Sequence, residues 1–370
     1  MTVLPRAFRP TRIEELRARY TAAADNGFFG PGSVTWKVWS YPSSIVIGFS
    51  RAVTIEQLDP NLNAAVEISG GVRYRPRTRY ERTMRYFALA AFGDTETATK
   101  AADVLVKVHS KAIGTDPVTG GRYDANNPAS QLWIHVTAWH SILYCYEQFG
   151  PGTLTETEER QYWDECARAA QLQTIDPADV PRTRDEVRAY FEQWRPRLAA
   201  SELAQSMTDF ILHTEVAFPD DLPRFAEPAR VPLARLFRMA VIATYPPHIR
   251  RLFGLSQSRV TDLAIRAFFR AHFAVIARTP WLYLRLLELI VPTTAPIAAP
   301  VVLGIPAASD VTMTPREAQA RYGYDSPAEA HRELRAQQEQ RVFARGESPS
   351  DAGLVESEAH IGAMGSPAAR

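Results

Sequence analysis

Three consecutive helical patterns constrain the fold of this chain more than any other feature of its sequence. They span residues 78–92, 95–113 and 128–149, and each repeats its apolar residues at the spacing of one helix face. The segment between the second and third patterns, residues 114–127, is rich in Gly, Asp, Asn and Pro and predicts a loop. We therefore expect the chain to be organised around three helices.

The first helical pattern has a cationic face that also bears hydroxyl groups. Positions i, i+3, i+4 and i+7 of this face are Arg79, Arg82, Thr83 and Tyr86. The face belongs to a run of arginines that starts at Arg73, and such a run most often forms a solvated surface. The alternative is a set of guanidinium groups for an anion such as a propionate or a phosphate, because the Arg fork matches a pair of oxygen atoms.

Histidines interrupt the apolar stripes of the other two patterns. His109 stands in the stripe of residues 95–113, and His135 stands in that of residues 128–149, with His140 on an adjoining face. A single histidine on an apolar helix face is more often a core residue with satisfied hydrogen bonds than a ligand. A buried neutral imidazole between helices is also the usual axial ligand of haem, so the pattern permits haem without requiring it.

The remaining chain continues in helical patterns. Thr155 and Glu158 fit a capping box that opens a further helix, and no strand alternation persists anywhere. These features predict the all-α class, with a single large multi-helix domain. The expected divisions are a lead-in with a short helix near residues 11–24 (1–26), a helical domain (27–305) and a polar, mostly disordered tail (306–370).

The segment from Trp281 to Pro306 is ambiguous. Its length and apolarity could span a bilayer, but Arg285, Glu288 and several prolines interrupt it. We favour a last core helix followed by an extended apolar segment on the domain. A peripheral membrane contact through residues 281–305 is the alternative, because interfacial segments tolerate such breaks.

Composition excludes some partners and compartments. A net charge of +1 with 22% charged residues argues against nucleic acid as a partner. Two cysteines do not make a disulfide scaffold, and the first twenty residues lack the apolar core of a secretory signal, so we expect a cytoplasmic location. The small number of lysines beside many arginines is typical of a GC-rich, actinobacterial genome.

Two kinds of catalytic site find little support in the sequence. Zinc sites usually show close ligand spacing such as HExxH or CxxC, and neither occurs here. A serine hydrolase of the α/β class would need a GxSxG turn between a strand and a helix, and the chain has neither that motif nor the strands. Zinc chemistry and serine hydrolysis are therefore not expected.

The three helical patterns also carry an ordered set of residues. The set is Arg79-Tyr80-Glu81-Arg82-Thr83, Tyr86, Phe92-Gly93, His109 with Gly114, Tyr123, Pro128, Leu132-Trp133-Ile134-His135, Ser141 and Tyr146. This order resembles the bacterial and fungal family of latex-clearing rubber oxygenases and MpaB-type oxygenases, over residues 30 to 290. Members with known activity are helical b-type haem proteins that cleave or oxidise isoprenoid chains with dioxygen.

The resemblance implies a role for each candidate site residue. It makes His109 the proximal iron ligand of haem b, and it places Arg79 and Thr83 beside the haem. His135 matches a recurrent histidine of the family, for which we expect contact with a haem propionate or with groups around the ligand. Arg82 departs from the pattern, because the rubber-cleaving members carry there a lysine that can cap the distal iron. A guanidinium stays protonated and cannot coordinate iron.

We therefore predict a haem-b-dependent oxygenase that acts with dioxygen on a small apolar, lipid-like or isoprenoid-like substrate. Arg79, Arg82 and Thr83 are its expected catalytic residues, and they would orient the oxygen or hold the haem periphery. The arginine at position 82 and the missing secretion signal argue against polyisoprene as the substrate. Two alternatives remain, a haem carrier or sensor without catalysis and a haem-free helical interaction protein in which His109 and His135 are core residues.

Overall fold

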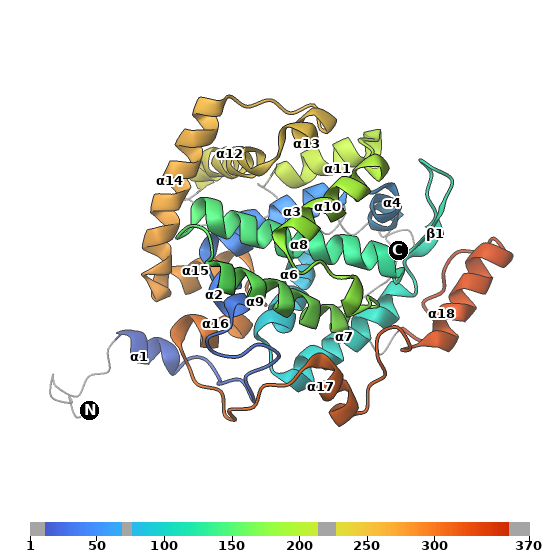
Figure 1. The fold of residues 1–370 in the computed structure, drawn as a ribbon, viewed down its shortest axis with the longest axis horizontal. Coiled ribbons are helices and arrows are strands. Elements are labelled where there is room, and N and C mark those ends of the chain that lie inside the picture. The colour runs from blue at the N-terminus through green and yellow to red at the C-terminus, as the bar shows by residue number, and fades with distance from the viewer. Residues whose placement is uncertain (1–11, 69–75, 214–226, 355–370) are drawn as a thin grey trace.

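The computed structural model describes residues 12–68, 76–213 and 227–354, and these ranges are mainly helical (Figure 1). Up to residue 149 the helices are α1 (Arg12–Arg17), α2 (Val34–Trp39), η2 (Ser44–Gly48), α3 (Phe49–Glu56), α4 (Pro60–Ile68), α6 (Pro76–Phe92), α7 (Thr95–His109) and α8 (Pro128–Phe149). Beyond it they are α9 (Glu156–Ala169), η3 (Ala170–Leu172), η4 (Pro177–Asp179), α10 (Arg184–Trp194), η5 (Arg195–Arg197), α11 (Glu202–Leu212), α12 (Glu227–Thr244), α13 (Pro247–Leu252), α14 (Arg259–Ala277), α15 (Pro280–Ile290), α16 (Ala295–Leu303), α17 (Pro315–Tyr322), α18 (Arg332–Glu339) and η7 (Gln340–Ala344). The predicted all-α class is confirmed.

Helix α8 runs through the middle of the molecule and is buried along most of its length (Figure 1). It begins and ends at the predicted residues. The Asn127 side chain accepts hydrogen bonds from the backbone N–H groups of Ala129 and Ser130, and Pro128 occupies the first turn, where it costs no hydrogen bond. The elements η2, α3, α14 and α2 pack against it. Side chains of α8 can therefore reach several neighbouring helices.

Two apolar clusters surround α8, and it contributes a different face to each. The first, with Trp39, Phe92 and Trp139, joins α8 to α2, α6, α9, α15 and α16. The second, with Trp133 and Tyr245, joins it to α3, α10, α12 and α14. Because α6 and α7 contribute to the first cluster, the candidate site residues lie on that side of α8.

Helix α7 ends four residues earlier than predicted. The Asp94 side chain caps its first turn, and its last helical residue is His109. Ile113, which continues the apolar stripe in sequence, belongs instead to strand β1 (Ile113–Thr115). This strand pairs antiparallel with β2 (Arg122–Asp124), inside the segment predicted as a loop. His109 thus stands at the carboxyl end of its helix.

The apolar segment after residue 280 divides into α15 and α16, which pack against each other and, through α16, against α6. Its apolar residues are largely used in the core: Tyr283, Leu284, Leu287, Val291, Ala298, Ala299 and Leu303 are buried. Within the described ranges, no helix has the length and apolarity to cross a membrane.

The polar segment from residue 306 differs from the expectation of a mostly disordered tail. Up to Leu354 it includes α17, α18 and η7, with α17 packed on α7. Polar contacts fix it to distant parts of the chain. Asn26 Nδ2 donates to Asp310 Oδ1 at 2.6 Å, and His331 Nε2 lies 2.8 Å from Asp103 Oδ1. Because these contacts are polar, the segment needs few apolar residues to hold its place. Its composition therefore resembles that of a disordered tail, which is why disorder was predicted.

Some predicted features lie outside the described residues. These are the first residues of the lead-in (1–11), the arginines Arg73 and Arg75 of the basic run, and the end of the tail (355–370). The short helix predicted near residues 11–24 is described as α1.

Candidate functional site

Helices α6 and α7 pack together and bring the cationic face close to His109. Burial lowers the pKa of His109 to about 4, and the positive charge of Arg79 is the second cause. Burial likewise lowers the pKa of Arg79, with the neighbouring Arg82 as the second cause. Thr83 Oγ1 donates to the Arg79 carbonyl at 2.9 Å, so its lone pairs remain available to accept. The structure therefore places Arg79 near His109, with Arg82 and Thr83 beside Arg79 on the same helix.

The two ring nitrogens of His109 have different surroundings. Nδ1 lies 3.1 Å from the amide nitrogen of Gln131, and this amide also donates to the carbonyl of Ala125. Nε2 has no hydrogen-bond partner among the residues that the structure describes. The residue as a whole is only half-buried, so part of its surface stays accessible although protein surrounds it. One nitrogen is held in place and the other is available to a ligand.

His109 is suited to bind a metal in a cofactor because it is neutral. With a pKa of about 4, the imidazole is in its neutral form near pH 7, and metal binding requires this form. The arginines beside it, whose guanidinium groups stay charged near pH 7, match the carboxylate groups of a haem. These side chains fit a haem with an axial histidine, which is the arrangement that the resemblance implies.

Gln131 sets the tautomer of His109. While its amide nitrogen faces Nδ1, this ring nitrogen accepts, so the neutral ring carries its proton on Nε2. Binding of iron through Nε2 requires the other tautomer, with the proton on Nδ1. A half-turn of the Gln131 amide would present its oxygen to that proton, and it would break the hydrogen bond that the amide nitrogen now donates to the Ala125 carbonyl. We therefore expect this amide to turn when the ring binds a metal.

His135 lies in a different environment. It is 2% exposed, its Nε2 lies 2.8 Å from the carbonyl oxygen of Cys166, and Cys166 Sγ is 3.4 Å away. Its ring also packs against Trp139 at a centroid distance of 5.8 Å. Burial lowers the pKa of His135 to about 4. The structure thus directs Nε2 of His135 to helix α9 and not to His109.

His140 belongs to a third neighbourhood, on the side of the second apolar cluster. Its Nδ1 lies 3.4 Å from Nη1 of Arg51, and the same guanidinium nitrogen donates to Ser141 Oγ at 2.5 Å. Burial holds the pKa of His140 well below its ordinary value, followed by the charges of Arg51 and Arg184. The three histidines of the sequence analysis therefore do not form one cluster.

Sequence reasoning missed one residue of the site and left another without a role. Gln131 was not singled out, although it stands one helical turn before His135 on α8. Tyr86 was placed on the cationic face, and its buried hydroxyl lies beside the Gln173 side chain, whose hydrogen bond limits the rise that burial causes in the pKa of Tyr86. Its place on the same helix face as Arg79 and Thr83 makes Tyr86 a further candidate for contact with a bound molecule.

A metal site made of protein ligands alone finds no support. Within ranges 12–68, 76–213 and 227–354, no three His, Cys, Asp or Glu side chains come together in an arrangement that could hold an ion. A metal at His109 would need further ligands from a cofactor.

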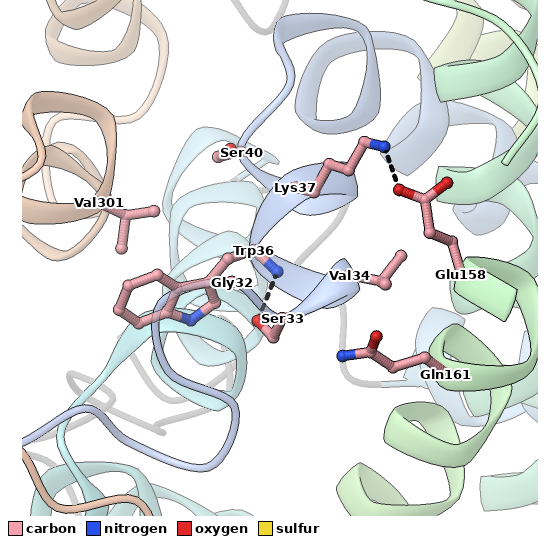
Figure 2. A pocket seen from close by; sticks show the side chains of 9 residues that line it. All are labelled: Gly32, Ser33, Val34, Trp36, Lys37, Ser40, Glu158, Gln161 and Val301. Carbon is pink, nitrogen blue, oxygen red and sulfur yellow. Dashed lines mark hydrogen bonds and ion pairs between the residues drawn. The ribbon is translucent and has the colours of Figure 1, made fainter. Parts of the chain in front are cut away.

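Two hollows lie away from these residues. One, of about 470 Å³, lies between α2, α9 and α16, and the Lys37–Glu158 ion pair of 2.5 Å stands at its edge (Figure 2). The other, of about 1270 Å³, lies between α4, the β-hairpin, the start of α8 and η7. None of the predicted site residues lines either hollow.

His135 should make the stability of the protein depend on pH. Its folded pKa of about 4 lies below the ordinary 6.5, so the unfolded chain binds a proton first as the pH falls. The stabilisation is complete above pH 6.5 and is lost as the pH falls toward 4, by up to about 3 kcal/mol. A His135→Gln variant keeps an amide nitrogen for the Cys166 carbonyl but does not titrate.

In urea unfolding from pH 7.0 to 4.5, the wild-type protein should lose about 2 kcal/mol more than this variant. Parallel losses would contradict a buried, neutral His135. A His272→Gln variant is the control, because His272 is exposed.

Comparison with known proteins gives one match. The family model described as "ER-bound oxygenase mpaB/B'/Rubber oxygenase, catalytic domain" matches residues 36–279, which is more than half of the chain. The match begins in α2, ends after α14 and includes the candidate site residues on α6, α7 and α8. Neither a curated protein nor a solved structure matches the chain.

Proposed function

The chain belongs to the mpaB/rubber oxygenase family, and from this premise we propose that it is a haem-b-dependent oxygenase acting on an apolar, lipid-like or isoprenoid-like substrate. The family assignment carries the oxygenase activity in general. The haem and the substrate class are the parts that we add. The residues around His109 support the haem, and the description of the matched family supports the substrate class.

One observation carries the proposal of haem. Of the two histidines that sequence periodicity could not distinguish, His109 is partly exposed and its Nε2 has no hydrogen-bond partner among the described residues, whereas Nε2 of His135 is hydrogen-bonded to a carbonyl in the core. An axial ligand needs a neutral imidazole with one free nitrogen, and its other nitrogen is usually held by a hydrogen bond. His109 meets these requirements when its proton lies on Nδ1 and the Gln131 amide has turned its oxygen toward this proton.

The residues of α6 would hold the periphery of the cofactor. Arg79 and Arg82 can bind carboxylates through two parallel hydrogen bonds, and Thr83 and Tyr86 add hydroxyl groups on the same face.

When bound, the haem supplies the activation of dioxygen. On the adjoining face of α6, Tyr80 and Phe87 belong to a group of packed aromatic rings that would shield the cofactor from water on that side. Phe49 lies 5.6 Å from Tyr80 and 5.8 Å from Phe87 between ring centroids.

The arginine at position 82 should keep the distal side free of a protein ligand. In an Arg82→Lys variant an amine replaces the guanidinium, and a lysine that loses its proton in a buried site can coordinate iron. We expect the absorption spectrum of the haem-loaded variant to change from that of the wild type, with a shifted Soret band. The measurement needs no substrate.

Arg85→Lys is the matched control, since Arg85 is exposed on the same helix. An unchanged spectrum in Arg82→Lys would mean that position 82 does not face the iron. A change in both variants would point to a general effect of lysine on α6.

The experiment that tests the proposed function combines haem binding with oxygen uptake. The purified chain is loaded with haem b, its content is measured as the pyridine haemochrome, and oxygen consumption is followed with unsaturated lipids and isoprenoids. Haem at about one per chain and substrate-dependent oxygen uptake are expected. Haem without turnover would indicate a carrier or sensor. Failure to bind haem would reject the proposal.

A further inference from the structure

The outward face of helix α14 is apolar. Four of its side chains are among the most exposed large apolar residues described: Val260 (77%), Val275 (60%), Leu263 (59%) and Phe268 (40%). Alanines 264, 267, 271 and 277 are exposed between and beside them. The helix runs along one edge of the molecule, where the described chain does not cover this face (Figure 1).

These residues form a stripe, not scattered contacts. Positions 260, 264, 267, 271 and 275 follow the spacing of one helix face, and the opposite face buries Ile265, Phe269 and Phe273 in the second apolar cluster. Helix α14 is therefore apolar on both sides. A helix on the surface of a soluble protein normally carries polar residues outward, and a contiguous exposed apolar face indicates a contact with something else.

The charges around this stripe are mainly positive. Helices α14 and α15 with the two residues between them carry five arginines and two carboxylates: Arg259, Arg266, Arg270, Arg278, Arg285, Asp262 and Glu288. One of the arginines, Arg266, is turned inward, where it donates to the Ala243 carbonyl. Both carboxylates are engaged. Asp262 accepts from Arg250 at 2.8 Å, and Glu288 accepts from Arg285 at 2.9 Å and from the Tyr20 hydroxyl at 2.7 Å. The stripe thus has a cationic rim.

A tryptophan and another arginine extend the surface at one end. Trp281, at the start of α15, is 37% exposed, and the guanidinium of Arg12 lies 4.0 Å from its ring centre. Glu14 and Glu15 are also exposed on the short helix α1 and reduce the positive charge there. Tryptophan and arginine beside an apolar face are typical of the boundary between lipid tails and head groups.

We propose that the outward face of α14, together with Trp281, docks on the surface of an anionic lipid bilayer. The helix would lie in the plane of the membrane, with its alanines, valines, leucine and phenylalanine among the upper acyl chains and its arginines among the lipid phosphates. Membrane contact through residues 281–305, which the sequence left open as the alternative, is limited by the burial of α16, and the exposed surface lies one helix earlier. This inference does not rest on the proposed function.

Charge distinguishes a bilayer from a second copy of the chain. A symmetric contact along α14 would bring like arginines of two protomers together, because the same patch would face itself. Like charges held at a few ångströms repel, whereas anionic lipid head groups attract the same arginines. The observations therefore favour the lipid surface.

The test is flotation of the full-length protein with lipid vesicles. We expect binding to vesicles of phosphatidylcholine with about one third phosphatidylglycerol to exceed binding to pure phosphatidylcholine at least tenfold, and high salt to weaken it. The double variant Leu263→Ser/Phe268→Ser should lose most of the binding to both kinds of vesicle. Arg270→Gln should weaken only the binding to anionic vesicles.

Val118→Ser is the matched control, because Val118 is a comparably exposed apolar residue (46%) between the two strands of the β-hairpin. Equal binding of the wild type and the double variant, or no binding to anionic vesicles, overturns the proposal. So does a wild-type dimer in sedimentation experiments that the double variant abolishes, because the same face would then bind a second copy. All three variants alter exposed side chains, and circular dichroism verifies that they fold.

Discussion

A His109→Gly variant is expected to bind haem at least about 100-fold more weakly than the wild-type chain. Loss of a group that merely orients a metal ligand already costs about 10- to 100-fold in affinity, so loss of the ligand itself should cost more. The free Nε2 of His109 is the group removed, and Gln131 and Arg79 stay in place. The measurement is a haem titration followed by the Soret band, with the pyridine haemochrome for stoichiometry.

Two controls separate loss of a ligand from loss of the fold. Added imidazole should restore the Soret band in His109→Gly, because the free ring can occupy the space that the side chain leaves. The His135→Gln variant should bind haem nearly as well as the wild type, since His135 points its Nε2 at Cys166. If His135→Gln lost haem while His109→Gly kept it, the assignment would be reversed. If both kept it, neither histidine would be the ligand.

The helices near the site could be predicted because their signals are local. Asn127 and Pro128 set the start of α8, and the periodicity of apolar residues predicted its length. Helix α7 was predicted too long because Ile113 continues its stripe. Only the pairing of Ile113 with Asp124 shows that the chain has turned into a hairpin by this point, and no local pattern contains that information.

Which residues meet across helices could not be predicted from periodicity. The inward position of His135 was foreseen, and the side chain is buried. Its neighbour, the Cys166 carbonyl, depends on how α9 crosses α8, which spacing along one helix does not determine. For the same reason Gln131 escaped notice. Its role as the partner of His109 appears only when the end of α7 and the first turns of α8 are seen together.

The glycine at position 27 should be as important to the fold as any large core residue. Its φ is +66°, and a Cβ at this position would lie 2.3 Å from the carbonyl oxygen of Gly93. Asp25 ties the same loop to the start of α7, where its carboxylate accepts from the backbone N–H and the hydroxyl of Thr95. A Gly27→Ala variant must move one of these two backbones, and α7 carries His109.

We expect Gly27→Ala to lower the free energy of unfolding by about 3 kcal/mol, from about 1 kcal/mol for the left-handed conformation and the rest for the displaced backbone. Gly254→Ala isolates the first contribution, because Gly254 has φ +63° and no atom lies within 4 Å of its added Cβ. Urea unfolding of both variants measures the difference. Equal losses would show that the loop and Gly93 can separate freely. A larger loss at Gly27 would show that the contact between this loop and α7 is rigid, and haem affinity should then fall in the same variant because His109 moves with its helix.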